Sequence, residues 1–374
     1  GYPRGQRPRT VTQGAATRYA PLPATFTLHT GGVLPNGRIA FETFGVADTT
    51  GERTILLFTG LSASAHASAS PRDPTPGWWQ QIVGPGRAID TDHWFVVCVN
   101  SLGSCFGSSG PTDTDATGRR WGPRFPTVSI EDIATGGWYV LQHLGLARVH
   151  SVVGASLGGM TVLAFAARHP GAARHLVSIS GTLAPSTIAI GLRAVQREAI
   201  ERDPAFLEGD YAPERPPRAG LRLARMLGTL TYRAPAGLQR RFGRQRTHGQ
   251  FDIEHYLALQ GERFADSFDA NAYLQLSRAM DRFDLAIDGD PARAFVAAKL
   301  ETALVIGVEQ DLLFPITDQE RIVEALERAG VPTRFVRVAS DEGHDAFLLD
   351  LAPFDTALRR HLKREDLDQA LRAR

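Results

Sequence analysis

The stretch Val152-Val-Gly-Ala-Ser156-Leu-Gly-Gly-Met160 decides how the rest of this 374-residue chain is interpreted. It contains a G-x-S-x-G pattern centred on Ser156, after the apolar run 150–153 and before an Ala-, Leu- and Phe-rich segment, 160–168, with helical composition. Strand, sharp turn and helix form the context of a nucleophile elbow, in which small residues let strand and helix approach closely. The serine hydroxyl then stands clear of the sheet. Ser156 is therefore the predicted nucleophile.

Other apolar segments predict a sheet around this elbow. The continuous apolar runs 54–58 and 94–100 suit strands that are buried on both faces, and residues 38–44 alternate like an edge strand. Further strands are expected at 176–180, 302–306 and 334–338, with helices at 130–144 and 318–329 between them. This alternation predicts an α/β fold, with a mostly parallel central sheet and helices on both faces.

The domain organisation follows from where this alternation stops. Residues 1–22 are rich in Arg, Pro and Gly without periodicity, and we expect a flexible N-terminal tail there. Residues 23–181 and 299–374 are expected to form the α/β core. Between them, residues 182–298 carry helical segments at 187–201, 220–231, 251–268 and 272–281. A helical block between two strands of one sheet predicts an inserted lid.

Two further residues complete a predicted catalytic triad. A serine hydroxyl needs a base near pH 7, and the base needs an orienting acid. In the elbow-containing folds the order is nucleophile, acid, histidine, the last two on loops after later strands. Asp311 follows the strand at 302–306, and His344 follows the last strand. Asp311 is preferred as the acid because Pro315 and apolar neighbours favour a fixed side chain; the alternatives nearby are Glu309, Asp341 and Glu342.

The oxyanion hole is expected to use two backbone N–H groups. One belongs to Leu157, directly after the nucleophile, and the other lies in the loop after the 54–58 strand, at Ser62. His66, in the same loop, has no second ligand at a metal-binding spacing. We therefore expect no metal and no bound cofactor.

The composition excludes several classes of partner. The 41 basic and 40 acidic residues give no electrostatic reason to bind nucleic acid or an anionic membrane. No apolar run is long enough to span a bilayer, and no secretory signal is visible. The two cysteines, Cys98 and Cys105, have neither a C-x-x-C spacing nor the density of a disulfide framework. A reduced, cytoplasmic setting is the expectation.

Residues 28–352 resemble the homoserine O-acetyltransferases of the α/β-hydrolase superfamily. The matching stretches are GWW at 77–79, GSSGP at 107–111, GPRFP at 122–126, QREAI at 196–200, LTYR at 230–233, RFGR at 241–244, SRAMD at 277–281, DLLFP at 311–315 and GHDAF at 343–347. Several of them lie in the lid, where plain hydrolases vary most.

The resemblance implies a two-step acyl transfer in methionine or cysteine biosynthesis. Ser156 would take an acyl group from acetyl-CoA or succinyl-CoA and pass it to the hydroxyl of L-homoserine or L-serine. Arg225 and Tyr232 match lid residues that line the active-site tunnel, and Asp345 matches the acid that binds the acceptor's amino group. The resemblance also implies a homodimer formed through the lid.

Departures from the family pattern leave the substrates open. The chain has Ser62 where threonine is common, and Gly-Ala-Ser-Leu-Gly where Gly-Ser-Met-Gly is usual. Residues 100–105 read Asn-Ser-Leu-Gly-Ser-Cys instead of Asn-Val-Leu-Gly-Gly-Cys, which resembles serine O-succinyltransferases and serine O-acetyltransferases of this fold. Two rival hypotheses stand beside acyl transfer: an esterase or lactonase that uses the same triad, and a catalytically inactive scaffold.

Overall fold

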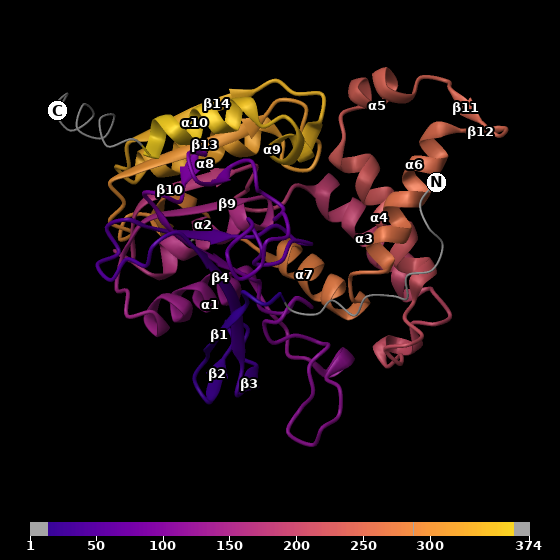
Figure 1. Ribbon diagram of the computed structural model, residues 1–374, viewed down its shortest axis with the longest axis horizontal. Helices are drawn as coiled ribbons and strands as arrows, with labels where there is room; N and C mark the ends of the chain where they lie inside the picture. Colours follow the sequence, from indigo (N-terminus) through magenta and orange to yellow (C-terminus); the bar gives the residue numbers. More distant parts are fainter. Residues whose placement is uncertain (1–13, 287, 363–374) are drawn as a thin grey trace.

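A twisted eight-stranded sheet forms the centre of the protein in the computed structural model, which describes residues 14–286 and 288–362 (Figure 1). The strand order is β1-β4-β8-β5-β9-β10-β13-β14. β1 and β8 both pair antiparallel with β4, and every later pairing in the sheet is parallel. The carboxyl ends of β5, β9, β10, β13 and β14 therefore lie at one edge, where ligands bind in such sheets.

The elements of the core have the following bounds. The strands of the main sheet are β1 (Arg18–Pro21), β4 (Arg38–Phe44), β5 (Thr54–Phe58), β8 (Phe95–Val99), β9 (Val149–Ala155), β10 (Ala173–Ile179), β13 (Thr302–Val308) and β14 (Thr333–Val338). The helices are α1 (Ile130–His143), α2 (Leu157–Arg168), α8 (Ile316–Arg328), α9 (Ala346–Leu349) and α10 (Ala352–Leu362), with short 3₁₀ turns η1 (Gly122–Arg124) and η4 (Gly343–Asp345). Two small strand pairs complete it: β2 (Thr25–Thr27) with β3 (Val33–Pro35), and β6 (Val83–Gly84) with β7 (Ile89–Asp90).

Alternate side chains of the strands build two separate hydrophobic cores. Leu56, Phe58 and Val152 point to the face that α1, α2 and α8 cover. Leu57 and Val153, one residue away, belong to the opposite core, which α10 closes. Successive side chains of a strand point to opposite faces, so strands covered on both faces are apolar throughout. This explains why β5 and β9 are buried along their whole length.

The lid is inserted between β10 and β13, two strands that are direct neighbours in the sheet. It contains α3 (Thr187–Glu201), η2 (Leu207–Gly209), α4 (Arg218–Tyr232), α5 (Pro235–Phe242), the hairpin β11 (Arg246–Thr247) and β12 (Gln250–Phe251), α6 (Asp252–Ala265), α7 (Ala270–Arg282) and η3 (Pro291–Ala294). Figure 1 shows these helices to one side of the sheet, with α7 reaching back toward the core. A Cβ on Gly220 of α4 would lie 2.6 Å from the Ala199 carbonyl oxygen of α3, so glycine permits this close helix packing.

One expectation about the N-terminal part needs correction, and the lid contains elements that were not predicted. The expected flexible tail over residues 1–22 is wrong for residues 18–21, which form β1 and pair with β4, with Tyr19 opposite Ala40. Residues 1–13 lie outside the described residues, as do 363–374 at the end of the expected core. The lid also contains a helix, α5, and a hairpin, β11–β12, that the sequence pattern did not predict.

Within residues 14–286 and 288–362, no helix combines the length and apolarity needed to cross a bilayer.

Candidate active site

Ser156 occupies a strained turn between β9 and α2. Its backbone has φ 59° and ψ −121°, a conformation that L-residues rarely adopt. The neighbouring glycines make this turn possible, because a Cβ on Gly154 would lie 2.2 Å from the Gly158 carbonyl oxygen. One on Gly158 would lie 2.5 Å from the carbonyl oxygen of Phe58, in the next strand. The turn therefore presents the serine at the carboxyl edge of the sheet, where its side chain is only partly buried.

A continuous chain of hydrogen bonds connects Ser156 to His344 and Asp311. His344 Nε2 lies 2.8 Å from Ser156 Oγ, and His344 Nδ1 lies 2.6 Å from Asp311 Oδ2. The second carboxylate oxygen of Asp311 accepts the backbone N–H groups of Leu313 and Phe314, both at 2.9 Å. Because a carboxylate can only accept, Nδ1 donates to Asp311, which leaves Nε2 to accept the serine proton.

The surroundings of His344 favour its protonated form. Burial by itself lowers the pKa of this imidazole, but the charge of Asp311 and its hydrogen bond outweigh burial and raise the pKa above 6.5. The Phe314 ring stacks on the imidazole with ring centres 4.8 Å apart. Trp79 Nε1 donates to the carbonyl of Phe347 at 2.9 Å, which holds the segment that follows His344. The contacts with Asp311 and Phe314, together with the anchored segment after His344, fix the orientation of the imidazole.

The two predicted oxyanion groups lie on neighbouring strand ends. Leu157 is the first residue of α2, whose N-terminus carries the positive end of the helix dipole. Ser62 lies in the loop after β5, and β5 pairs directly with β9 through Phe58 and Gly154. Both residues therefore follow strands that end at the same carboxyl edge of the sheet. Their role in holding an oxyanion stays a prediction.

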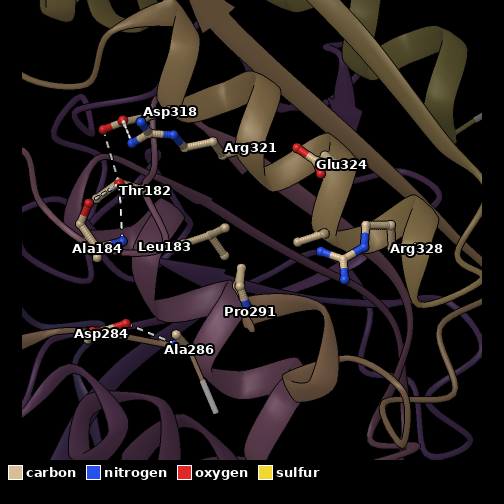
Figure 2. A pocket seen from close by; sticks show the side chains of 11 residues that line it. Thr182, Leu183, Ala184, Asp284, Ala286, Pro291, Asp318, Arg321, Glu324 and Arg328 are labelled. Carbon is tan, nitrogen blue, oxygen red and sulfur yellow. Dashed lines mark hydrogen bonds and ion pairs between the residues drawn. The ribbon is translucent and has the colours of Figure 1, made fainter. Parts of the chain in front are cut away.

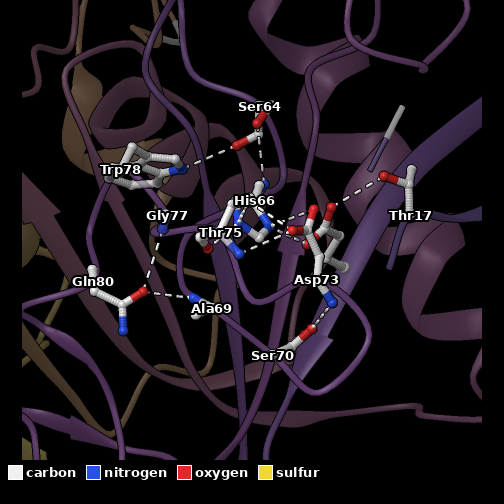
Figure 3. Close-up of polar contacts among 11 residues, drawn as sticks. Thr17, Ser64, His66, Ala69, Ser70, Asp73, Thr75, Gly77, Trp78 and Gln80 are labelled. Carbon is white, nitrogen blue, oxygen red and sulfur yellow. Dashed lines mark hydrogen bonds and ion pairs between the residues drawn. The ribbon is translucent and has the colours of Figure 1, made fainter. Parts of the chain in front are cut away.

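A partly buried ion pair of His66 and Glu42 holds the loop that contains Ser62 (Figure 3). His66 Nε2 donates to the carbonyl of Thr75 at 2.8 Å, and His66 Nδ1 lies 2.8 Å from the carboxylate of Glu42 in β4. Burial lowers the pKa of His66, but the hydrogen bonds to Glu42 and Thr75 outweigh it and raise the pKa overall. The Glu42 carboxylate also accepts the Thr17 hydroxyl at 3.1 Å. His66 thus has a structural contact that ties the loop to the antiparallel edge of the sheet.

The predicted substrate-binding residues Tyr232 and Arg225 lie on one side of His344. Tyr232, at the end of α4, has its ring centre 5.8 Å from that of His344. The Arg225 guanidinium lies over the Tyr232 ring at 5.4 Å and over the Phe264 ring at 5.0 Å. Among the residues that the structure describes, no carboxylate forms an ion pair with Arg225. In the described part of the chain, Arg225 is thus a cation next to Tyr232 that has no carboxylate in direct contact.

Asp345 has a partner that the sequence did not identify. Its carboxylate lies 3.3 Å from Arg233 Nε, and Arg233 also pairs with Glu342. Burial raises the pKa of Asp345, with the charges of Arg233, His344 and Arg225 acting in the opposite direction. Arg233 belongs to the LTYR stretch at 230–233, which resembles the acyltransferase family. This shared motif was the sequence signal that could have marked Arg233 as a site residue. Asp345 thus lies beside His344 as half of an ion pair.

Surface cavities lie outside the triad, and two of them border the lid. The first, of about 310 Å³, lies where the chain enters and leaves the lid (Figure 2). In it the buried Asp318 accepts the Thr182 hydroxyl at 3.1 Å and pairs with Arg321 at 3.5 Å. The second, of about 270 Å³, is lined by Arg233, Gly237, Leu238, Arg240, Arg241, Tyr256, Asp341 and Glu342. Arg233 thus connects this cavity to the Asp345 side of the active site.

The cysteines and the acidic side chains offer no second reactive centre in the described part of the chain. Cys98 and Cys105 are both free, and burial raises the pKa of the Cys105 thiol to about 12. Within residues 14–286 and 288–362, no group of three or more His, Cys, Asp or Glu side chains is arranged to hold a metal ion. Ser156 is a hydroxyl group in contact with a histidine that is itself hydrogen-bonded to a buried carboxylate.

Comparison with known proteins identifies the family. The protein-family model that describes the α/β-hydrolase fold matches residues 53–351 of this chain. This chain belongs to the α/β-hydrolase family. Among curated members of this family, it is 45% identical to a serine O-succinyltransferase of Litchfieldella anticariensis, over 91% of this chain and 96% of that protein. It is 44% identical to an L-serine/homoserine O-acetyltransferase of Streptomyces lavendulae, over 93% and 97%.

Solved structures of α/β-hydrolases agree with this assignment. A homoserine O-acetyltransferase from Bacillus anthracis superimposes with a TM-score of 0.86 at 24% identity, over 94% of this chain and 99% of that one. A mutant of esterase E22 superimposes with a TM-score of 0.85 at 26% identity, over 93% and 99%. The predicted fold class is confirmed, and the resemblance to O-acyltransferases of this family is confirmed at much higher identity than the resemblance to esterases.

Proposed function

We propose that this α/β-hydrolase is an O-acyltransferase that moves an acyl group from a coenzyme A thioester to the hydroxyl of L-serine or L-homoserine. The observation that carries the proposal is Arg225, a cation without a carboxylate partner among the described residues, next to Tyr232 and the catalytic base. A hydrolase of simple esters has no use for such a cation, whereas an amino acid acceptor brings a carboxylate that fits it. The identity of about 45% to named acyltransferases supports the same conclusion.

The first half-reaction forms an acyl-enzyme. Ser156 Oγ attacks the thioester carbonyl carbon as His344 Nε2 takes its proton, and a C–O bond forms. The oxyanion of the tetrahedral intermediate is stabilised by the N–H groups of Leu157 and Ser62. When the C–S bond breaks, the proton on Nε2 goes to the departing thiolate. Free coenzyme A leaves, and Ser156 carries the acyl group.

In the second half-reaction an amino acid, and not water, accepts the acyl group from Ser156. His344 Nε2 takes the proton of the acceptor hydroxyl, whose oxygen attacks the acyl carbon. The bond to Ser156 Oγ then breaks, and the proton passes from Nε2 to this oxygen. Arg225 binds the acceptor carboxylate, and Tyr232 lies between Arg225 and His344. The Asp345–Arg233 pair faces the ammonium group of the acceptor. O-acyl serine or homoserine is the product, an activated precursor for cysteine or methionine biosynthesis.

We further place this reaction in the cytoplasm, in a homodimer assembled through the lid. Two free cysteines and the need for a coenzyme A thioester support the first statement. The second is supported by apolar side chains that the lid leaves exposed in this subunit, among them Ile188, Val195, Leu223, Leu230 and Leu259. A monomeric protein rarely exposes so many large apolar residues in one region.

The test measures release of free thiol from acetyl-CoA and succinyl-CoA, with and without L-serine or L-homoserine. We expect release to depend on the amino acid and O-acyl product to form. Ser156→Ala should lower turnover by about 10⁴-fold or more and abolish acyl-enzyme in intact-protein mass spectra. Thiol release that is independent of any amino acid, with free carboxylic acid as the product, would instead identify a hydrolase. An unreacted Ser156 would identify an inactive scaffold.

A further inference from the structure

The corner between α4 and α5 of the lid packs directly on the turn that carries His344. A Cβ on Gly343 would lie 2.8 Å from the Tyr232 carbonyl oxygen and 2.8 Å from the Ala234 amide nitrogen. Gly343 also has φ 61°, a conformation that favours glycine. The backbone of the lid corner is thus in contact with the backbone of this turn. Arg233, between Tyr232 and Ala234, extends its side chain from this contact.

The Arg233 side chain is 12% exposed and contacts polar groups on both sides of this junction. Its Nη1 forms an ion pair with the Glu342 carboxylate, and its Nη2 donates to the hydroxyl of Tyr256, in α6, at 3.3 Å. Its Nε lies 3.3 Å from Oδ2 of Asp345. Glu342 and Asp345 flank the turn of the catalytic base, whereas Tyr256 belongs to the lid. The guanidinium is therefore fixed where the lid meets the base.

The contact between Arg233 and Asp345 is one of charge and not of hydrogen bonding. Arg233 Nε is buried, and among the described residues it has no hydrogen-bond partner, so its N–H is not directed at the Asp345 carboxylate. The Asp345 side chain also caps no helix N–H group. Its oxygens therefore lie close to a positive charge but remain available as acceptors. An ammonium group, with three N–H donors, is the complementary ligand.

The charges that face Asp345 come from several elements. They belong to Arg225 and Arg233 of the α4 segment, to the adjacent His344, and to Asp311 in the loop after β13. Burial raises the pKa of the Asp345 carboxyl above 3.8, and the charge of Arg233 is the largest of the effects that act in the opposite direction. Without Arg233 this pKa should rise further, since burial and the charge of Asp311 both favour the neutral form. A neutral carboxyl group no longer attracts an ammonium ion.

We infer that Arg233 is a positioning residue for the acceptor: it holds Asp345 in place and in its charged form, without occupying the oxygens that receive the ammonium group. The inference rests on the proposed transfer to an amino acid and concerns its second half-reaction. Arg233 acts through Asp345 and not on the reacting atoms. Because Arg233 also binds Glu342 and Tyr256, recognition of the ammonium group depends on the lid lying against the base.

The experiment compares L-serine with β-hydroxypropionate, which is serine without its ammonium group, as acceptors from one coenzyme A thioester. We expect the wild-type protein to prefer serine. Arg233→Gln should raise KM for serine by about 10-fold or more and leave transfer to β-hydroxypropionate little changed. Raising the pH ionises Asp345 again, so KM for serine in this variant should fall toward the wild-type value while serine keeps its ammonium proton. Arg233→Lys, which keeps the charge, should recover part of the preference for serine.

A matched variant separates recognition from structure. Arg240, in α5, pairs with Asp341 of the same loop but is 66% exposed, so Arg240→Gln should leave the ratio of serine to β-hydroxypropionate activity unchanged. Acylation of Ser156 in Arg233→Gln, followed by intact-protein mass spectrometry, should match the wild type.

Three results would count against the inference. It is overturned while acyl transfer stands if Arg233→Gln slows both acceptors alike, if it fails to acylate Ser156, or if higher pH does not restore its KM for serine. A wild-type protein that transfers no acyl group to any acceptor would remove the proposed function and the inference with it.

Discussion

At the residue scale, the pair of Asp311 and His344 sets the pH dependence of the reaction. Nε2 must be unprotonated to accept the serine proton, so kcat/KM should rise with pH as His344 loses its proton. Because Asp311 raises the pKa of His344, this rise should be centred above pH 6.5. A profile centred well below this value would contradict the role of Asp311 as a charged partner.

The substitution Asp311→Asn tests the same pair directly. Without the carboxylate charge the pKa of His344 should fall, and the rise in kcat/KM should move to lower pH. The plateau rate should also drop, by about 10⁴-fold, because an amide can hold the imidazole in the wrong tautomer. The measurement is a pH–rate profile for acylation of Ser156 in both proteins. An unchanged midpoint would show that Asp311 is not coupled to the base.

At the scale of elements, the elbow depends on glycines that bring β9 and α2 together. Gly154→Ala would place a methyl group 2.2 Å from a backbone oxygen, so strand and helix must move apart. We expect loss of activity and a free energy of unfolding lower by about 1–3 kcal/mol or more. Urea titration measures the change in the free energy of unfolding, as a shift in the midpoint of the unfolding transition at an unchanged m-value.

Gly191 provides the matched control for this glycine substitution. It lies in α3, is exposed, and has no atom within 4 Å of an added Cβ. Gly191→Ala should therefore raise the free energy of unfolding by up to about 1 kcal/mol through helix propensity, with activity retained. If Gly154→Ala and Gly191→Ala lost similar amounts of activity and of unfolding free energy, the elbow would not be specially constrained.

At the scale of the whole molecule, the proposed homodimer is expected to form through the lid. Val195 of α3 and Leu223 of α4 are 58% and 51% exposed, and Ile188, Leu230 and Leu259 of the lid helices are exposed as well. We expect light scattering to give twice the subunit mass of 40.6 kDa. Val195→Glu combined with Leu223→Glu should shift the protein toward monomer, since charges are costly in an apolar interface. A wild-type protein that is monomeric at micromolar concentration would contradict assembly through the lid.

The sequence by itself predicted a mostly parallel sheet with a helical insertion, and it named Ser156, Asp311 and His344, which the structure joins by hydrogen bonds. The helix expected at 187–201 matches α3 at both ends, and the strand at 54–58 matches β5. These features depend on signals contained in a few consecutive residues: apolar runs, helical spacing, and glycines beside a serine. Asp311 and His344 could be found because each follows a strand, and parallel strands end at one edge. The order of elements was therefore enough to bring them together.

Only the tertiary structure determined which charged side chains meet. Asp281 is 88 residues from Arg193, and Glu342 is 109 residues from Arg233, so no local pattern connects either pair. The same holds for Glu42 and His66, and for β1, whose short strand is defined by its pairing with β4. An ion pair has no sequence period, because it depends on two helices or loops packing at a particular place. The fold therefore had to be known before Arg233 could be recognised as the partner of Asp345.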